Sequence, residues 1–117
     1  MKKNVFILAL LTTLLGFTSC ISEPEMNRPD LYVVNGSDYS VQVYCDNHLV
    51  TTASAHSNSG RTPLIDVSIN IPVFVEAKFY DKKGEYVGRY SWNNYYFTWN
   101  ASYKMTLQNS GGQLTQF

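Results

Sequence analysis

The sequence has few of the residues that build disulfide scaffolds, metal centres or strongly charged surfaces. Its 117 residues include only two Cys and two His, and charged residues make up 15% of the chain. Two cysteines are too few for a disulfide-rich scaffold. The two histidines, which have no HxH or HExxH spacing, do not supply the three or four ligands that zinc needs. Nine basic residues balance nine acidic ones, so charge gives no reason to expect a nucleic-acid partner.

The first 20 residues have a pattern typical of bacterial export. A basic start, Met-Lys-Lys-Asn, precedes an apolar run over residues 5–15. That run is short for a membrane-spanning helix of about 20 residues and suits a cleaved signal. Residues 17–20 read Phe-Thr-Ser-Cys and resemble the lipobox of bacterial lipoproteins, with Phe17 where leucine is usual. The alternatives are an ordinary secretory signal with Cys20 there by chance, or a retained membrane helix.

The lipobox resemblance implies how the chain is processed and where it resides. Residues 1–19 are a signal peptide, and Cys20 receives a diacylglyceryl thioether and acyl chains such as palmitate. Two or three acyl chains give stable membrane anchoring. Ile21 follows in place of the Asp that retains lipoproteins in the inner membrane, which favours the outer membrane, with the domain facing the periplasm or the cell surface. Residues 20–30 then form the lipidated tether, in which the acidic stretch 22–25 is either plain solvated linker or a surface-export signal.

From residue 31 onward the sequence alternates apolar and polar residues with period two, which is typical of half-buried β-strands. Asn-Gly, Asp-Asn and a loop ending in Gly84 separate the apolar runs. Residues 53–61 have the composition of a loop, and residues 110–117 are expected to be a loose C-terminal tail. We expect strands over residues 31–34, 39–45, 48–52, 64–71, 73–80, 86–92 and 103–108.

About seven short strands with turns between them predict one all-β domain over residues 31–109, an antiparallel β-sandwich. Three segments resemble parts of small immunoglobulin-like or transthyretin-like domains of bacterial lipoproteins. They are Tyr-Val-Val-Asn-Gly-Ser (32–37), Val-Gln-Val-Tyr-Cys-Asp (41–46) and Ala-Lys-Phe-Tyr-Asp-Lys-Lys-Gly (77–84). The resemblance implies a sandwich in the cell envelope and no active site.

The alternation also predicts which side chains form the core. Cys45 is in phase with Val41 and Val43, so we interpret it as a small buried hydrophobe rather than a redox thiol. Once Cys20 is alkylated, Cys45 has no partner for a disulfide within the chain. The expected core includes Val41, Val43, Val75, Phe79, Tyr103 and Leu107.

Aromatic residues are concentrated between residues 86 and 103. Exposed rings stack on sugars, and asparagine side chains bind hydroxyl groups, so this stretch is a candidate glycan site. Its expected ligand-binding residues are Asn93, Asn94, Tyr95, Tyr96, Phe97 and Trp99. The alternative is that the rings are core. In a continuous strand Tyr95, Phe97 and Trp99 share one side, with Trp99 partly buried, and Tyr96 faces outward.

No catalytic set, metal site or cofactor is expected, because no nucleophile elbow or metal-ligand spacing is present. We therefore expect a non-enzymatic, membrane-anchored structural or protein-interaction module of the envelope. The alternative is a surface glycan-binding module, and an immunity-type or assembly-accessory lipoprotein is a third hypothesis. An exposed aromatic platform at residues 95–99 favours a glycan, whereas buried rings and a free strand edge favour a protein partner that adds a strand.

Overall fold

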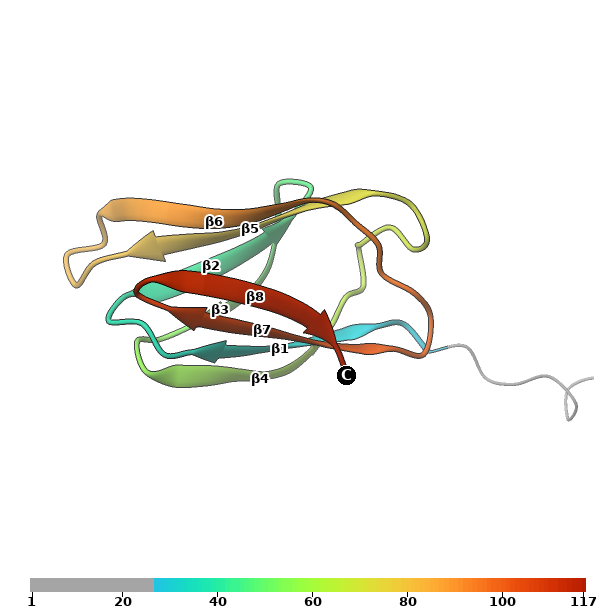
Figure 1. The fold of residues 1–117 in the computed structure, drawn as a ribbon, viewed down its shortest axis with the longest axis horizontal. Helices are drawn as coiled ribbons and strands as arrows, with labels where there is room; N and C mark the ends of the chain where they lie inside the picture. Colours follow the sequence, from blue (N-terminus) through green and yellow to red (C-terminus); the bar gives the residue numbers. More distant parts are fainter. Residues whose placement is uncertain (1–26) are drawn as a thin grey trace, which may run out of the picture.

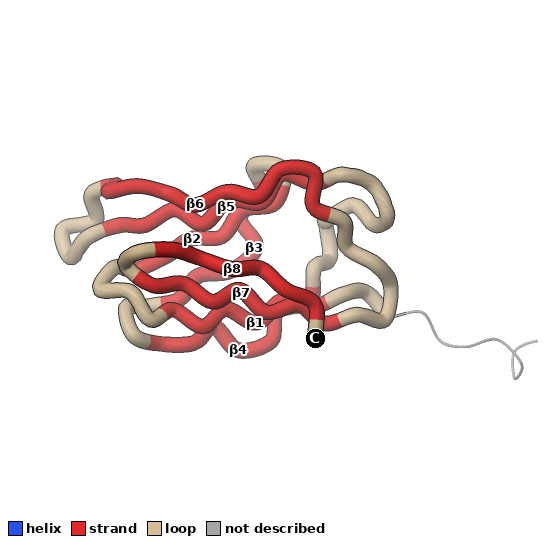
Figure 2. The backbone as a smooth tube through the Cα atoms, in the orientation of Figure 1, coloured by secondary structure: helices blue, strands red, loops and turns tan. Residues whose placement is uncertain are grey.

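Two four-stranded sheets pack face to face and form a β-sandwich. The computed structural model describes residues 27–117, and the two layers are visible in Figure 1 and Figure 2. One sheet has the order β4-β1-β7-β8 and the other has the order β3-β2-β5-β6. The strands are β1 (Asp30–Asn35), β2 (Ser40–Cys45), β3 (His48–Ala53), β4 (Ser57–Pro63), β5 (Val73–Tyr80), β6 (Tyr86–Tyr95), β7 (Ser102–Gln108) and β8 (Gly111–Gln116). The predicted all-β sandwich is confirmed.

The strand pairing adds two details to the prediction. Residues 27–117 form eight strands rather than about seven, and β1 runs parallel to β7 although the other pairs are antiparallel. The first strand lies between the fourth and the seventh. This order differs from the ABED and CFG sheets of a constant-type immunoglobulin domain. The order differs because β1 pairs in parallel with β7 of the β7–β8 hairpin, which places β1 between β4 and β7.

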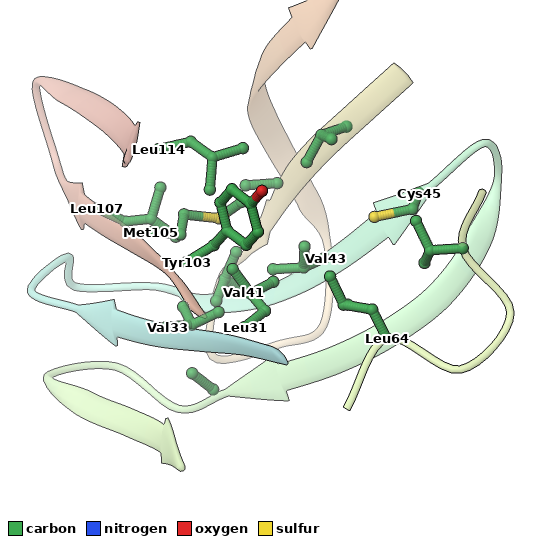
Figure 3. Packing of buried hydrophobic residues seen from close by; sticks show 14 of the residues in the cluster. Leu31, Val33, Val41, Val43, Cys45, Leu64, Tyr103, Met105, Leu107 and Leu114 are labelled. Atoms are coloured by element: carbon green, nitrogen blue, oxygen red, sulfur yellow. The ribbon is translucent and has the colours of Figure 1, made fainter. Parts of the chain in front are cut away.

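The core lies between the sheets and is formed by alternate residues of the central strands. The buried positions of β1, β2 and β7 follow the period-two pattern, with inward side chains such as Val33, Val43 and Met105. Figure 3 shows these side chains converging from both sheets, with Cys45 among them. Every residue of the expected core is buried, Phe79 at 5% exposure being the most accessible of them.

The sequence prediction was wrong about residues 53–72. The polar stretch expected to be a loop forms β4, an edge strand paired with β1. The apolar stretch 64–71 is a loop, because Leu64 and Val67 turn inward to close one end of the core while Ile65 is 66% exposed. An edge strand that exposes most of its side chains lacks the alternation of apolar and polar residues from which a strand is predicted.

The expected loose tail is also a strand. Residues 111–116 pair with β7 in continuous register, from Leu107 opposite Gly112 to Tyr103 opposite Gln116. Leu114 is buried at 8% exposure and extends the core under β6. Two adjacent glycines weaken the strand signal, so pairing and burial, rather than local preference, form β8.

The loops gather at the two ends of the sandwich, which we call the N-terminal pole and the far pole. The N-terminal pole consists of residues 27–29, the turn 46–47, the loops 64–72 and 96–101, and Phe117 (Figure 1). The far pole consists of the connections 36–39, 54–56, 81–85 and 109–110. Within residues 27–117 no helix is long and apolar enough to cross a membrane.

Candidate functional site

The aromatic stretch leaves the end of β6 and runs across the N-terminal pole. A bulge precedes it, because Phe74 alone faces both Asn93 and Asn94 between the pairs Val75–Trp92 and Val73–Tyr95. Asn94 has φ of 55°, a left-handed conformation that asparagine tolerates better than most residues. The extra residue keeps both Trp92 and Tyr95 on the inner side of the sheet.

Of the expected binding rings, Phe97 is part of the core and Tyr95 is partly buried against it. Phe97 is fully buried, and its ring meets that of Tyr103 edge-on at 4.9 Å between centroids. Tyr95 packs on Phe97 at 5.1 Å and on Tyr103 at 5.9 Å. Burial, with a smaller contribution from Tyr103, raises the pKa of the Tyr95 hydroxyl. These contacts close the end of the sandwich and leave the Phe97 ring no surface on which a ligand could stack.

Trp99 is half-buried and is covered by Arg28. The Arg28 guanidinium lies 5.3 Å from the centre of the Trp99 ring and donates hydrogen bonds to the carbonyl oxygens of Leu64 and Val67. Asn27 and Asn100 exchange two hydrogen bonds of 2.7 and 2.8 Å. Arg28 and Asn27 thus join the start of the described chain to both large loops of the pole, and the Arg28 guanidinium covers one face of the Trp99 ring.

Among the aromatic residues at positions 93–99, Tyr96 is the most accessible, with 53% of the residue exposed. Its outward direction and the partial burial of Trp99 are confirmed. Asn93 and Asn94 are exposed but form the β6 bulge. Within residues 93–99 Tyr96 is thus one exposed ring without a second fully exposed ring beside it, which differs from the planar aromatic platform expected for sugar stacking.

The remaining candidate chemistry is held in local contacts. His56 lies 2.7 Å from Asp38, whose pKa is lowered by hydrogen bonds from Asn109 and His56. Glu76, which is buried, pairs with Arg89. In the part of the chain that the structure describes, no three His, Cys, Asp or Glu side chains are placed to hold a metal ion. The predicted lipidation residue, Cys20, lies outside the described residues.

The free edge of β8 is a candidate site that the sequence prediction missed. No strand of residues 27–117 pairs with β8 on the side opposite β7. Its register with β7 has no bulge, and its sequence, Gly-Gly-Gln-Leu-Thr-Gln, contains neither charge nor proline. The Asn109-Ser110-Gly111 turn after β7 was the available signal of a hairpin.

The other three edge strands carry features that discourage pairing with another chain. The strand β4 has a bulged register, Arg61 and Pro63. The strand β6 has two register shifts and Arg89, and β3 has one shift. Bulges, charges and prolines are the usual means of protecting an edge, so β8 is the edge best suited to accept an added strand.

Comparison of the chain with protein-family models and with curated protein sequences finds no match.

Proposed function

We propose that this chain is a lipoprotein of the bacterial cell envelope, anchored through Cys20 in the outer membrane. Its β-sandwich acts as a non-enzymatic interaction module that binds an extended segment of another envelope protein along β8. The observation that carries the proposal is the regular, uncharged and unpaired edge of β8. Main-chain hydrogen bonds along such an edge supply affinity for an added strand.

The arrangement of the aromatic rings supports a protein partner over a glycan. Phe97 and Tyr95 pack in the core and Trp99 lies under Arg28. The rings therefore serve to close the sandwich. The free edge of β8 still offers backbone groups to an added strand, with the Leu114 carbonyl accepting a long hydrogen bond of 3.5 Å from the Tyr95 hydroxyl. The orientation of the domain towards the periplasm or the cell surface belongs to the same proposal.

Substitution of Cys20 tests the anchor. Cys20→Ser removes the thiol that takes the diacylglyceryl group, so we expect a protein without acyl mass that leaves the membrane fraction, since stable attachment requires the acyl chains. Mass spectrometry of the wild-type amino-terminal peptide provides the direct measurement. An unmodified Cys20 in membrane-bound wild type contradicts the anchor.

Charged side chains on β8 test the interaction surface. The variant with Gln113→Lys and Thr115→Lys places two ammonium groups on exposed positions of β8. We expect cross-linked partner in intact cells to fall about tenfold or more, equivalent to a loss of about 1.4 kcal/mol in binding free energy, because edge lysines oppose strand addition.

The matched control is Ser91→Lys on the bulged edge strand β6, where the side chain is also exposed. It should leave the cross-linked product unchanged. Equal loss in both variants, or no cross-linked protein with wild type, contradicts binding at β8. A glycan array with wild type and Tyr96→Ala tests the alternative function. Glycan binding by wild type that is lost in Tyr96→Ala favours a glycan-binding module over a protein-binding one.

A further inference from the structure

Exposed large apolar side chains are concentrated at the N-terminal pole and its rim. Of seven such residues in the described chain, two lie together at the start of β6, Tyr86 and Val87. The other five lie on the loops and strand ends at the N-terminal pole, the end of the sandwich at which Asn27 enters the fold. They are Leu49 (56% exposed), Ile65 (66%), Ile71 (53%), Tyr96 (53%) and Phe117 (60%).

The loops that carry these side chains are held in place from inside. Leu64 and Val67 are buried on either side of Ile65. The Asn70 amide donates a 2.8 Å hydrogen bond to the Phe97 carbonyl, which links the two loops that carry Ile71 and Tyr96. The protein therefore presents these apolar groups to solvent in a fixed arrangement, and clustered exposed apolar groups mark contact with a membrane or another protein.

The apolar surface continues into a hollow beside β3. This hollow, of about 370 Å³, lies between the start of β3 and the chain that follows β4, and its lining includes Leu49, Val50, Pro63 and Ile65. Leu49 and Ile65 thus line the same hollow, together with the polar residues His48, Thr62 and Asp66.

The charges of the pole do not provide an electrostatic attraction to anionic lipid. Arg61 lies 3.3 Å from Asp30, and Arg28 is engaged by two carbonyl oxygens and Trp99. Asp46, His48 and Asp66 are the other titratable groups there, and all three are exposed. With two arginines against three aspartates, contact with a bilayer must depend on the apolar side chains.

The position of the proposed anchor indicates that a bilayer is what contacts the exposed apolar side chains of the N-terminal pole. Cys20 precedes Asn27 by seven residues, which span at most about 25 Å when extended. The start of the described fold lies at the N-terminal pole, so an acylated Cys20 keeps this pole within that distance of the membrane surface. The far pole lies a further strand length away, about 20–30 Å for strands of six to ten residues.

We propose that the N-terminal pole lies in the interface of the bilayer that holds the Cys20 anchor, with Ile65, Ile71 and Tyr96 in contact with lipid. This inference rests on the lipidation proposed above. The sandwich is then oriented with its far pole away from the membrane, and the edge of β8 faces sideways, accessible to a partner beside it.

Lipid-based quenching of a site-specific fluorophore tests the contact. The mature acylated protein, which begins at Cys20, is reconstituted into phosphatidylcholine nanodiscs, with or without phosphatidylglycerol. An environment-sensitive fluorophore is attached to a cysteine introduced by Tyr96→Cys, while the native Cys45 is buried. Lipids with a quencher near the headgroup should reduce its emission several-fold, equally with both lipid compositions, since apolar contact does not depend on lipid charge.

The matched control is Tyr86→Cys, because Tyr86 is as exposed as Tyr96, at 54% against 53%, but lies at the other end of β6. It should show little quenching. Replacing Ile65 and Ile71 by serine in the Tyr96→Cys protein should lower quenching at position 96 and leave the acyl mass unchanged. Equal quenching at positions 86 and 96, or none at 96 in a protein of verified acyl mass, overturns the proposal and points to a protein partner at this pole. Absence of the acyl mass instead overturns the anchor itself.

Discussion

Cys45 is a small core side chain at the end of β2, and its surroundings account for its chemistry. The residue is 2% exposed and faces Val75 across the β2–β5 pair. Burial, with a smaller contribution from the charge of Asp46, raises the pKa of the Cys45 thiol from 9.0 to about 12. A thiol that stays protonated and covered is neither nucleophilic nor readily oxidised.

The shifted pKa predicts a loss of stability on the alkaline side. Below pH 9 the thiol is protonated in both states, so its contribution is fully present. Between pH 9 and about 12 the unfolded state releases the proton while the folded state keeps it, so the free energy of unfolding falls as pH rises. The raised pKa of Tyr95 adds a loss of the same sign above its ordinary value of 10.0.

Urea unfolding of wild type and Cys45→Ala between pH 7 and 10.5 measures this effect. Cys45→Ala should be less stable at neutral pH, because it leaves a cavity, but its stability should fall less steeply above pH 9. Parallel pH profiles for the two proteins, or rapid labelling of Cys45 by a thiol reagent in the folded state, contradict the prediction.

Asn35 begins a turn that the sequence predicts, but its hydrogen-bond partners cannot be predicted from the sequence around it. The Asn35-Gly36-Ser37 sequence correctly indicates a turn after the first strand. The structure adds that Asn35 is buried and that its side-chain amide donates hydrogen bonds to the carbonyl oxygens of Tyr39 and Ser54, at 2.8 and 3.0 Å. Those partners lie in two different connections of the far pole, and no local pattern identifies them.

At the scale of elements, β8 is a strand whose conformation is stabilised by packing against neighbouring strands. A Cβ at Gly112 would lie 2.9 Å from a Leu107 methyl, 3.3 Å from the Tyr90 ring and 3.5 Å from the Trp92 ring. The inner rings of β6 therefore rest directly on the β8 backbone and need a residue without a side chain there. The adjacent Gly111 has open space around the same position.

Alanine substitutions at the two glycines test this packing. Gly112→Ala should lower the free energy of unfolding by about 1–3 kcal/mol, because the added methyl overpacks a filled region. Gly111→Ala should be neutral or raise it by about 0.4–1 kcal/mol, since it restricts the unfolded chain without a clash. Urea denaturation of both variants is the measurement. Equal effects would mean that β6 does not pack on β8.

The two bulges of β6 change which of its side chains face inward, and a strict period-two pattern does not predict them. A strict period of two places Tyr86 in phase with Tyr90 and Trp92, yet the register shift near Val87 moves Tyr86 to the outer face, where its ring packs on Tyr80 at 5.9 Å. The second shift brings Tyr95 inward. One extra residue moves every later side chain of a strand to the opposite face of the sheet. The sequence does not indicate where that residue is inserted.

At the scale of the whole molecule, the proposed anchor and the proposed partner site lie on different surfaces. The exposed apolar loops surround the entry of Asn27 at the N-terminal pole, whereas β8 is a lateral edge that extends towards the far pole (Figure 1). A domain held at one end and open along one side can engage a membrane and an extended protein segment at the same time. The two proposals therefore do not compete for the same residues.

The sequence by itself determined the all-β class and the core of alternating residues, because both follow from the period-two geometry of a strand. The outward direction of Tyr96 was also predicted, but Tyr96 lies in a loop after the end of β6, so strand geometry is not its cause. Only the tertiary structure decided that polar residues 57–63 and glycine-containing residues 111–116 are edge strands. It also decided that the apolar stretch 64–71 is a loop and that most rings of the aromatic stretch lie in the core or pack against it. Edge strands and loops take their conformation from the partners that cover them, and those partners are distant in the chain.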